Sequence, residues 1–264
     1  MERSLIRCWQ VGSHKIFHEN SISKLSLLRQ IIMRGVNRTL LKHIRLGKFE
    51  FGLSSKKSFR REDDKQVKIS VVYYSMTGSV FKLAQIIADG AREAGAEVRL
   101  RRVPDLLPKE VIDSNEHIKN ALAAQQEVPV ATLEDLVWAD GIAFGSPTRY
   151  GNMTAQLKNF LDQTGPLWAE GKLAGKAAGF FTGAATMHGG HETTILTMST
   201  FAYHHGMIIV PTGYLVPAVH GTATGGSPYG PSELGSKNEL SEDERSIALF
   251  LGRRLAEVAG KLSK

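Results

Sequence analysis

The chain of 264 residues lacks most of the features that would place it in a special class of protein. Cys8 is its single cysteine, which excludes an internal disulfide framework and a metal cluster built on cysteine. No run of eighteen apolar residues occurs, so the sequence predicts no stable membrane insertion. A G-x-S-x-G elbow and a Gly-Lys-Ser/Thr ending are also missing, which argues against a serine hydrolase and a P-loop NTPase.

Charge is distributed unevenly along the chain. Of the 33 Lys and Arg residues, 15 lie in residues 1–66 together with 6 acidic residues, whereas residues 67–264 hold 18 basic and 20 acidic residues. The high isoelectric point therefore describes an N-terminal extension and does not predict nucleic-acid binding by the remainder. Residues 1–66 resemble an organelle transit peptide, but a disordered basic arm, or an unused upstream start with Met33 as the natural one, explains them equally well.

The stretch Val67–Val80 joins a short apolar run to an amphipathic helix through a turn rich in Ser, Thr and Gly. The apolar run predicts a strand of a parallel sheet that is buried on both faces. Its turn would lie at a helix N-terminus, where free backbone N–H groups and the helix dipole favour a phosphate. The alternative is a turn in which these residues serve only to cap the helix.

Strand and helix patterns then alternate along residues 67–264. Further strands are predicted at Glu97–Val103, Asp140–Gly145, Leu173–Thr182 and Met207–Val210, with helices at Val80–Ala94, near Glu116–Gln126, from Thr132 to Trp138, from Met153 to Gly165, at Thr193–His205 and after Ser241. This order predicts an α/β domain with a doubly wound, five-stranded parallel sheet and helices on both faces.

Ligands of such sheets bind at the carboxyl ends of the strands. Three unusual loops should meet there, namely Ser75–Val80, Thr148–Asn152 and the Gly-rich Gly183–Gly190. A fourth segment, Pro217–Ser236, is long enough to favour a functional loop over a simple connection. We therefore expect one phosphate-bearing ligand with a flat ring, the latter held beside Arg149 and Tyr150.

Other candidate residues have simpler explanations when each is taken alone. His188, His191 and Glu192 lie in a Gly-rich setting without an H-x-x-x-H helix, which argues against zinc. A helix-terminal His such as His204 is more often a cap, and a Trp such as Trp168 more often an anchor in a core or interface. Since neither a nucleophile nor an acid/base pair stands out, a bound cofactor is expected to perform the chemistry.

Five segments in order, VVYYSMTGSV, FGSPTRYGNM, LKNFLDQTGPLW, HHGMIIVPTGY and GGSPYG, resemble the WrbA family of NAD(P)H:quinone oxidoreductases. The resemblance covers about residues 67–262. It implies a flavodoxin-like fold, non-covalent FMN, NADH or NADPH as the electron donor, and a homotetramer in the cytoplasm. The implied reaction is a ping-pong, two-electron reduction of quinones to hydroquinones.

The resemblance also implies roles for individual residues. It assigns the 5′-phosphate to the first loop, the isoalloxazine to the second, further flavin contacts to the third and to a helix-end histidine, and the substrate side to a tryptophan. The residues so matched are Ser75, Met76, Thr77, Gly78, Ser79 and Val80; Thr148, Arg149, Tyr150, Gly151 and Asn152; Gly183, Ala184, Ala185, Thr186, His188 and Gly189; His204; and Trp168. The chain departs from the family pattern at Thr77, where an aromatic residue is common, and in the string TGAATMHGGHE.

Two rival functions belong to other classes. A flavodoxin that carries single electrons usually docks through a strongly charged surface, and the near-neutral residues 67–264 argue against that. A nucleic-acid-binding regulator would need a helix-turn-helix or a basic recognition face, and neither is evident outside the extension.

Overall fold

The computed structural model describes residues 66–235 and 239–263. The predictions for the N-terminal extension lie outside the described residues, apart from Gln66. The described chain forms one unit, and the predicted start of the domain at Val67 agrees with the first strand, β1 (Lys68–Tyr73).

All strands are parallel and follow the order β2-β1-β3-β4-β5, which confirms the predicted doubly wound, flavodoxin-like sheet. Beside β1 these strands are β2 (Glu97–Arg102), β3 (Gly141–Pro147), β4 (Ala177–Ala184) and β5 (Ile208–Ile209). β5 is shorter than predicted, because Pro211 follows closely and cannot donate a ladder hydrogen bond. β2 alternates in sequence and is half-exposed, as expected of an edge strand.

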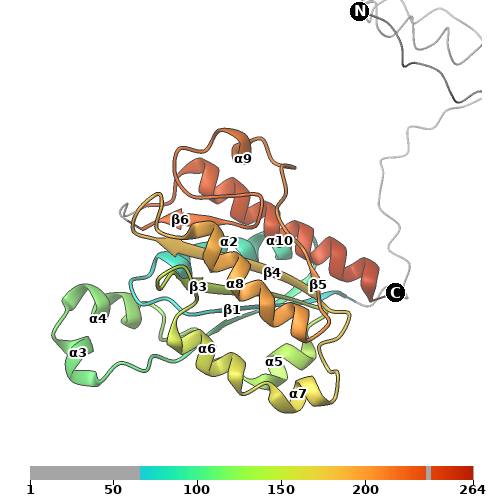
Figure 1. Cartoon of the computed structure of the whole chain (residues 1–264), viewed down its shortest axis with the longest axis horizontal. Coiled ribbons are helices and arrows are strands. Elements are labelled where there is room, and N and C mark those ends of the chain that lie inside the picture. The colour runs from blue at the N-terminus through green and yellow to red at the C-terminus, as the bar shows by residue number, and fades with distance from the viewer. Residues whose placement is uncertain (1–65, 236–238, 264) are drawn as a thin grey trace, which may run out of the picture. The chain divides into compact units, whose positions relative to one another are not determined.

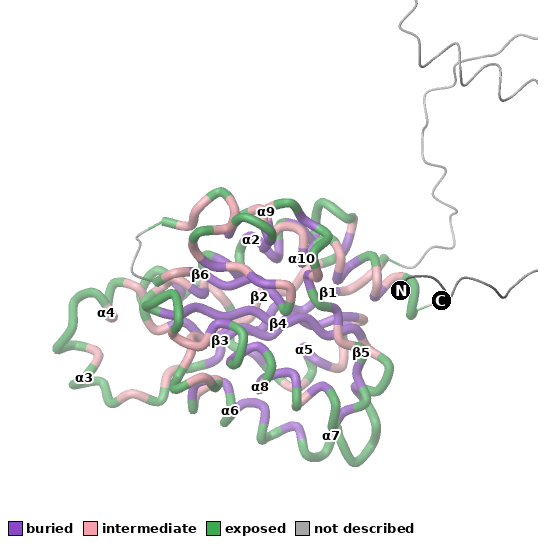
Figure 2. Tube along the Cα trace, turned by 45° about the horizontal axis from the view of Figure 1, so that its top comes forward, coloured by how far each residue is buried: buried purple, intermediate pink, exposed green. Residues whose placement is uncertain are grey.

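Helices cover both faces of the sheet (Figure 1). α2 (Ser79–Glu93) and α10 (Glu242–Leu262) pack on one face, and α5 (Leu133–Trp138), α6 (Ala155–Asp162) and α8 (His191–His204) pack on the other. Gly90 and Gly252 let α2 and α10 touch backbone to backbone, since a Cβ at Gly252 would lie 2.0 Å from the carbonyl oxygen of Ile87. The sheet is enclosed between these layers, and Figure 2 shows its central strands buried throughout.

The long segment predicted as a loop contains structure of its own. It holds a short helix, α9 (Ala218–Gly221), and a sixth strand, β6 (Ser232–Leu234). β5 pairs with the beginning of β4 at Ala177 and Ala178, whereas β6 pairs with its end at Thr182, Gly183 and Ala184. The chain therefore leaves the sheet after β5 and returns to the same edge of β4, beside its carboxyl end.

Residues 109–130, which the sequence predicts to be mostly irregular, form two helices, α3 (Lys109–Asp113) and α4 (Glu116–Ala123). The buried amide of Gln125 ties this region to the first turn, because it donates hydrogen bonds to the carbonyls of Ser75 (3.1 Å) and Ala121 (2.7 Å). Another short helix, α7 (Gly165–Ala169), begins where the sequence predicts the preceding helix to end. Among the residues described, no helix has both the length and the apolar character needed to cross a membrane.

Candidate functional site

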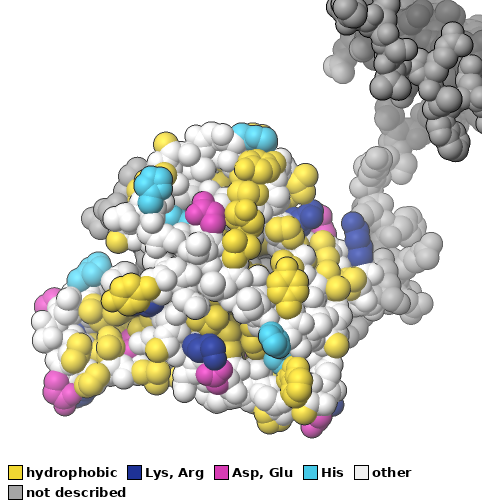
Figure 3. Space-filling model, in the orientation of Figure 1, with side chains coloured by type: hydrophobic (Ala, Val, Ile, Leu, Met, Phe, Trp, Pro, Cys, Tyr) yellow, Lys and Arg dark blue, Asp and Glu magenta, His cyan; other side chains and the backbone are white. Residues whose placement is uncertain are grey.

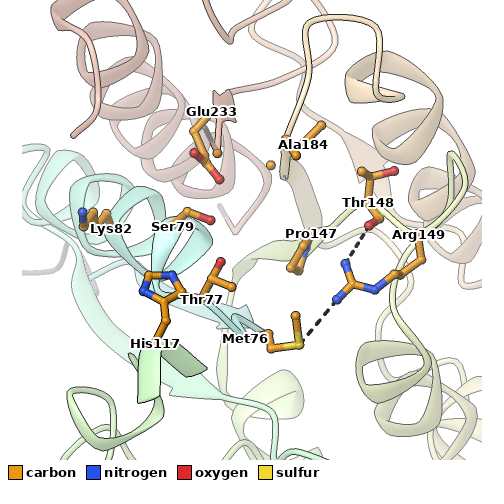
Figure 4. Close-up of a pocket in the computed structure, with 13 residues that line it drawn as sticks. Met76, Thr77, Ser79, Lys82, His117, Pro147, Thr148, Arg149, Ala184 and Glu233 are labelled. Atoms are coloured by element: carbon orange, nitrogen blue, oxygen red, sulfur yellow. Dashed lines mark hydrogen bonds between the residues drawn. The ribbon is translucent and has the colours of Figure 1, made fainter. Parts of the chain in front are cut away.

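A cavity of about 360 Å³ lies where β1, β3 and β4 end. Its walls come from the turn after β1, the loop after β3, the end of β4, the strand β6 and helix α4 (Figure 4). Eight of the predicted site residues line it: Met76, Thr77, Ser79, Thr148, Arg149, Gly183, Ala184 and Ala185. The expected meeting of three loops at the carboxyl edge of the sheet is thus present in the fold.

The turn after β1 leaves the N-terminus of α2 open to a ligand. Gly78 is the N-cap residue with φ of 89°, and no side chain caps the helix among the described residues. Ser75 is 3 % exposed, and its hydroxyl has no hydrogen-bond partner among them. An orphaned buried hydroxyl next to free backbone N–H groups suits an anion. The capping alternative for this turn is therefore wrong.

The second loop makes a tight reversal from Arg149 to Asn152. The two residues exchange backbone hydrogen bonds of 2.7 and 3.0 Å. Between them, Tyr150 has φ of 54° and Gly151 has φ of 79°, as the two central residues of a type I′ turn require. The left-handed conformation is costly for a tyrosine, and the turn holds the Tyr150 ring entirely in solvent.

Thr148 and Arg149 fix this loop to the rest of the site. The Thr148 hydroxyl accepts hydrogen bonds from the Gly151 N–H (3.2 Å) and from the Thr194 hydroxyl of α8 (2.8 Å). The Arg149 guanidinium donates to the Thr148 carbonyl (2.8 Å) and to the Met76 sulfur (3.7 Å), so it reaches from the second loop to the first (Figure 4). A positive charge therefore stands at the edge of the cavity.

The third loop meets the second directly. A Cβ placed on Gly190 would lie 3.0 Å from the Cα of Gly151, so only glycine permits this approach. Three of the predicted flavin residues in this loop do not line the cavity, namely Thr186, His188 and Gly189; Thr186 and His188 are exposed. The same holds for Ser75, Gly78, Val80, Tyr150, Gly151 and Asn152, which support the cavity or lie beside it.

Five lining residues were missed from the sequence: Lys82, His117, Pro147, Glu233 and Gly235. Lys82 follows Ser79 by three residues on α2, and that helical spacing could have indicated it. His117 and Glu233 carried no such signal, because the elements that bring them to the cavity were read as irregular chain. Glu233 is 3 % exposed, and burial raises its pKa to about 7.

Trp168 and His204 line a second cavity, of about 420 Å³. It runs from Met153 to Trp168, whose indole N–H donates to the His204 carbonyl (3.0 Å). Since α8 has 14 residues, His204 lies about 20 Å along the helix from the third loop. These two residues therefore do not share the cavity of the other predicted residues.

His205 also lines the second cavity, next to His204. Burial and the neighbouring charge of His204 lower its pKa, and its ring nitrogen Nε2 lies 3.1 Å from the Thr164 hydroxyl. No group of three His, Cys, Asp or Glu side chains that would hold a metal ion occurs in the described part of the chain. The geometry thus favours an organic anion with an aromatic ring over a metal.

Residues 67–221 match the model of a family described as NADPH-dependent FMN reductase. An NAD(P)H dehydrogenase (quinone) of Geobacter sulfurreducens is 46 % identical over 203 residues, which cover 75 % of this chain and 100 % of that protein. One from Aromatoleum aromaticum is 46 % identical over 202 residues, which cover 74 % of this chain and 97 % of that protein. A solved structure of a flavodoxin, WrbA-like protein from Agrobacterium tumefaciens aligns with a TM-score of 0.53 at 25 % identity, over 74 % of this chain and 99 % of that one.

Proposed function

The chain belongs to the NADPH-dependent FMN reductase family, and we propose that it is an FMN-dependent NAD(P)H:quinone oxidoreductase. The resemblance to the WrbA family predicted from the sequence is confirmed by these relatives. The single observation that carries the proposal is the uncapped N-terminus of α2, with the orphaned Ser75 hydroxyl, at the head of a cavity that two further loops enclose.

The first loop would hold the 5′-phosphate of FMN, and the second would hold its ring. The hydroxyls of Ser75, Thr77 and Ser79 and the N–H groups at the start of α2 are phosphate ligands of a common kind. Bound there, FMN supplies the redox chemistry, since it accepts a hydride from NADH or NADPH and passes two electrons to a quinone. Nothing in the chemistry of the lining residues opposes this assignment except Glu233.

The chain's own side chains would bind, orient and stabilise charge. Arg149 places a guanidinium at the edge of the cavity, where a positive charge would favour the reduced, more electron-rich ring. Tyr150 presents an unobstructed aromatic ring beside the same loop, suited to stacking on a flat ligand. Contacts from Thr186, His188 and Gly189 stay predictions.

We also propose that the protein is a homo-oligomer, a tetramer as the resemblance implies. Large hydrophobic side chains on and around α8 are exposed, among them Trp168, Leu196, Tyr203, Ile208, Tyr214 and Leu215. Figure 3 shows hydrophobic side chains along the face that carries α7 and α8. Apolar surface of this kind marks a protein interface. A second copy would also offer a way for Trp168 and His204 to approach a flavin.

Light scattering after gel filtration tests the assembly. The wild type should elute with about four times the mass of one chain, whereas Leu196→Asp should elute with a smaller mass. Leu106→Asp, at an exposed leucine in the loop after β2, is the matched control and should leave the mass unchanged. A monomeric wild type would refute the oligomer.

Turnover separates the enzyme from the rival electron carrier. The purified protein should release FMN on denaturation and oxidise NADH or NADPH with benzoquinone, one quinone for each nicotinamide. Initial rates against both substrates should give parallel reciprocal plots, as a ping-pong reaction requires. A protein that holds FMN but does not turn over would be a carrier, and one that holds no FMN would refute the cofactor.

A further inference from the structure

Glu233 places a carboxylate inside the cavity that should receive a phosphate. It lies on β6 opposite Gly183, and a Cβ on that glycine would be 2.3 Å from its Oε1. The side chain is 3 % exposed, and in Figure 4 it points from β6 toward Ser79 at the start of α2. The Ser79 hydroxyl donates a hydrogen bond to it. The carboxylate thus uses a donor that the phosphate would need.

The charges around Glu233 come from several elements. Lys82 of α2 attracts its carboxylate and Glu244 of α10 repels it, while β4, against which β6 pairs, presents Gly183 and no charge. His117 of α4 and Arg149 of the second loop line the same cavity. Burial is the largest influence and raises the pKa of Glu233 to about 7, with the repulsion from Glu244 acting in the same direction.

Two anions that share one set of donors repel each other strongly away from bulk water. A proton on Glu233 removes the repulsion and converts its side chain from an acceptor into a donor for phosphate oxygens. We propose that Glu233 determines flavin binding in this protein: the cavity accepts the 5′-phosphate when Glu233 is protonated and rejects it when Glu233 is ionised. This inference rests on the proposed function, because it needs FMN at this cavity.

A linked proton follows from this competition. If the phosphate dianion binds only to the protonated form, then binding above neutral pH must draw a proton from solvent. Riboflavin has the same ring without the phosphate, so its binding should draw none. The contrast between the two flavins separates an effect of Glu233 on the phosphate from a general effect of pH on the site.

The experiment titrates the full chain, freed of flavin, with FMN and with riboflavin, and follows the quenching of flavin fluorescence at pH 6, 7, 8 and 9. Wild type is compared with Glu233→Gln, which keeps the shape of the side chain, and with Glu242→Gln, an exposed glutamate on α10, as the control. Relative to Glu233→Gln, which removes the background from the phosphate's own titration, the wild-type Kd for FMN should rise about tenfold between pH 6 and 8. Riboflavin should show no such difference.

Calorimetry in two buffers of different ionisation enthalpy gives a second readout that needs no variant. At pH 8 the wild type should take up about one proton on binding FMN and none on binding riboflavin. Equal pH profiles for wild type and Glu233→Gln, or no uptake with FMN, would overturn the inference and leave FMN binding intact. Failure of every protein to bind FMN at any pH would overturn the proposed function as well.

Discussion

Glu244 and Glu233 are buried to the same extent, at 2 and 3 % exposure, yet their surroundings differ. The Glu244 carboxylate accepts backbone hydrogen bonds from Gly225 (2.9 Å), Leu234 (2.9 Å) and Ser241 (2.7 Å). It closes a capping box on α10 and fastens the long segment that carries β6. Glu233 receives one hydroxyl donor, and burial raises its pKa to about 7. The number of donors therefore decides whether a buried carboxylate supports the fold or is free to titrate.

The largest expected effect is that of removing Glu244. Glu244→Ala leaves three backbone N–H groups without their acceptor, and we expect the free energy of unfolding to fall by roughly 3–5 kcal/mol. Urea denaturation measures this change. Glu242→Ala, in the exposed first turn of the same helix, is the control and should cost no more than about 1 kcal/mol through the helix dipole. Equal losses in the two variants would remove the distinction between the glutamates.

The pH dependence of stability should come next in size and depend on Glu233. Its pKa of about 7 in the folded state exceeds the ordinary value of 4.5, so the folded protein binds this proton more tightly than the unfolded chain. The resulting stability is complete below pH 4.5 and is lost as the pH rises through 7. We expect the flavin-free protein to lose about 2–3 kcal/mol between pH 5 and 8 relative to Glu233→Gln. Urea midpoints that shift in parallel in both proteins would contradict this.

A smaller effect tests where the Glu233 carboxylate lies. A Cβ at Gly183 would meet Oε1 of Glu233 at 2.3 Å, so Gly183→Ala must displace that side chain, and we expect a loss of about 1–2 kcal/mol. In a Glu233→Ala background the same substitution should cost less than about 0.5 kcal/mol, because the obstructing atoms are gone. A double-mutant cycle from urea denaturation gives the coupling, and independent, additive losses would show that the two residues do not touch.

The smallest effect concerns the charge next to Glu233. Lys82 lowers the pKa of Glu233, and Lys82→Met should therefore move its titration to higher pH by less than about one unit. Lys82→Arg retains the charge and should leave the titration unchanged. The measurement is the carboxyl ¹³C chemical shift of Glu233 against pH. A shift to lower pH in Lys82→Met would have the wrong sign and would contradict the assigned surroundings.

Much of the fold could be predicted because its signals are local. The apolar run before Ser75 and the turn at Gly78 identify β1 and α2 without reference to the rest of the chain. The Ser241 and Glu244 capping box likewise predicts the start of α10, and the structure has both of its hydrogen bonds. The expectation of one ligand edge followed from the topology of parallel strands, and the cavity lies there.

The parts that could not be predicted depend on contacts distant in sequence. β6 was missed because three residues in a segment rich in Gly and Pro become a strand only by pairing with the end of β4. His117 reaches the cavity because Gln125 ties α4 to the Ser75 carbonyl, 50 residues away. Trp168 and His204 were grouped with the flavin residues by resemblance, but α7 and α8 place them at another cavity.

By itself, the sequence determined the order of strands and helices, the phosphate-type turn and the family, since these rest on periodicity, turn chemistry and motifs along the chain. The tertiary structure alone decided which side chains face the bound phosphate. Glu233 is an unremarkable acid in the sequence, and only the pairing of β6 with β4 buries it beside Ser79, where desolvation changes its protonation. Burial and neighbouring charge are properties of a place in the fold, and no local pattern of residues encodes them.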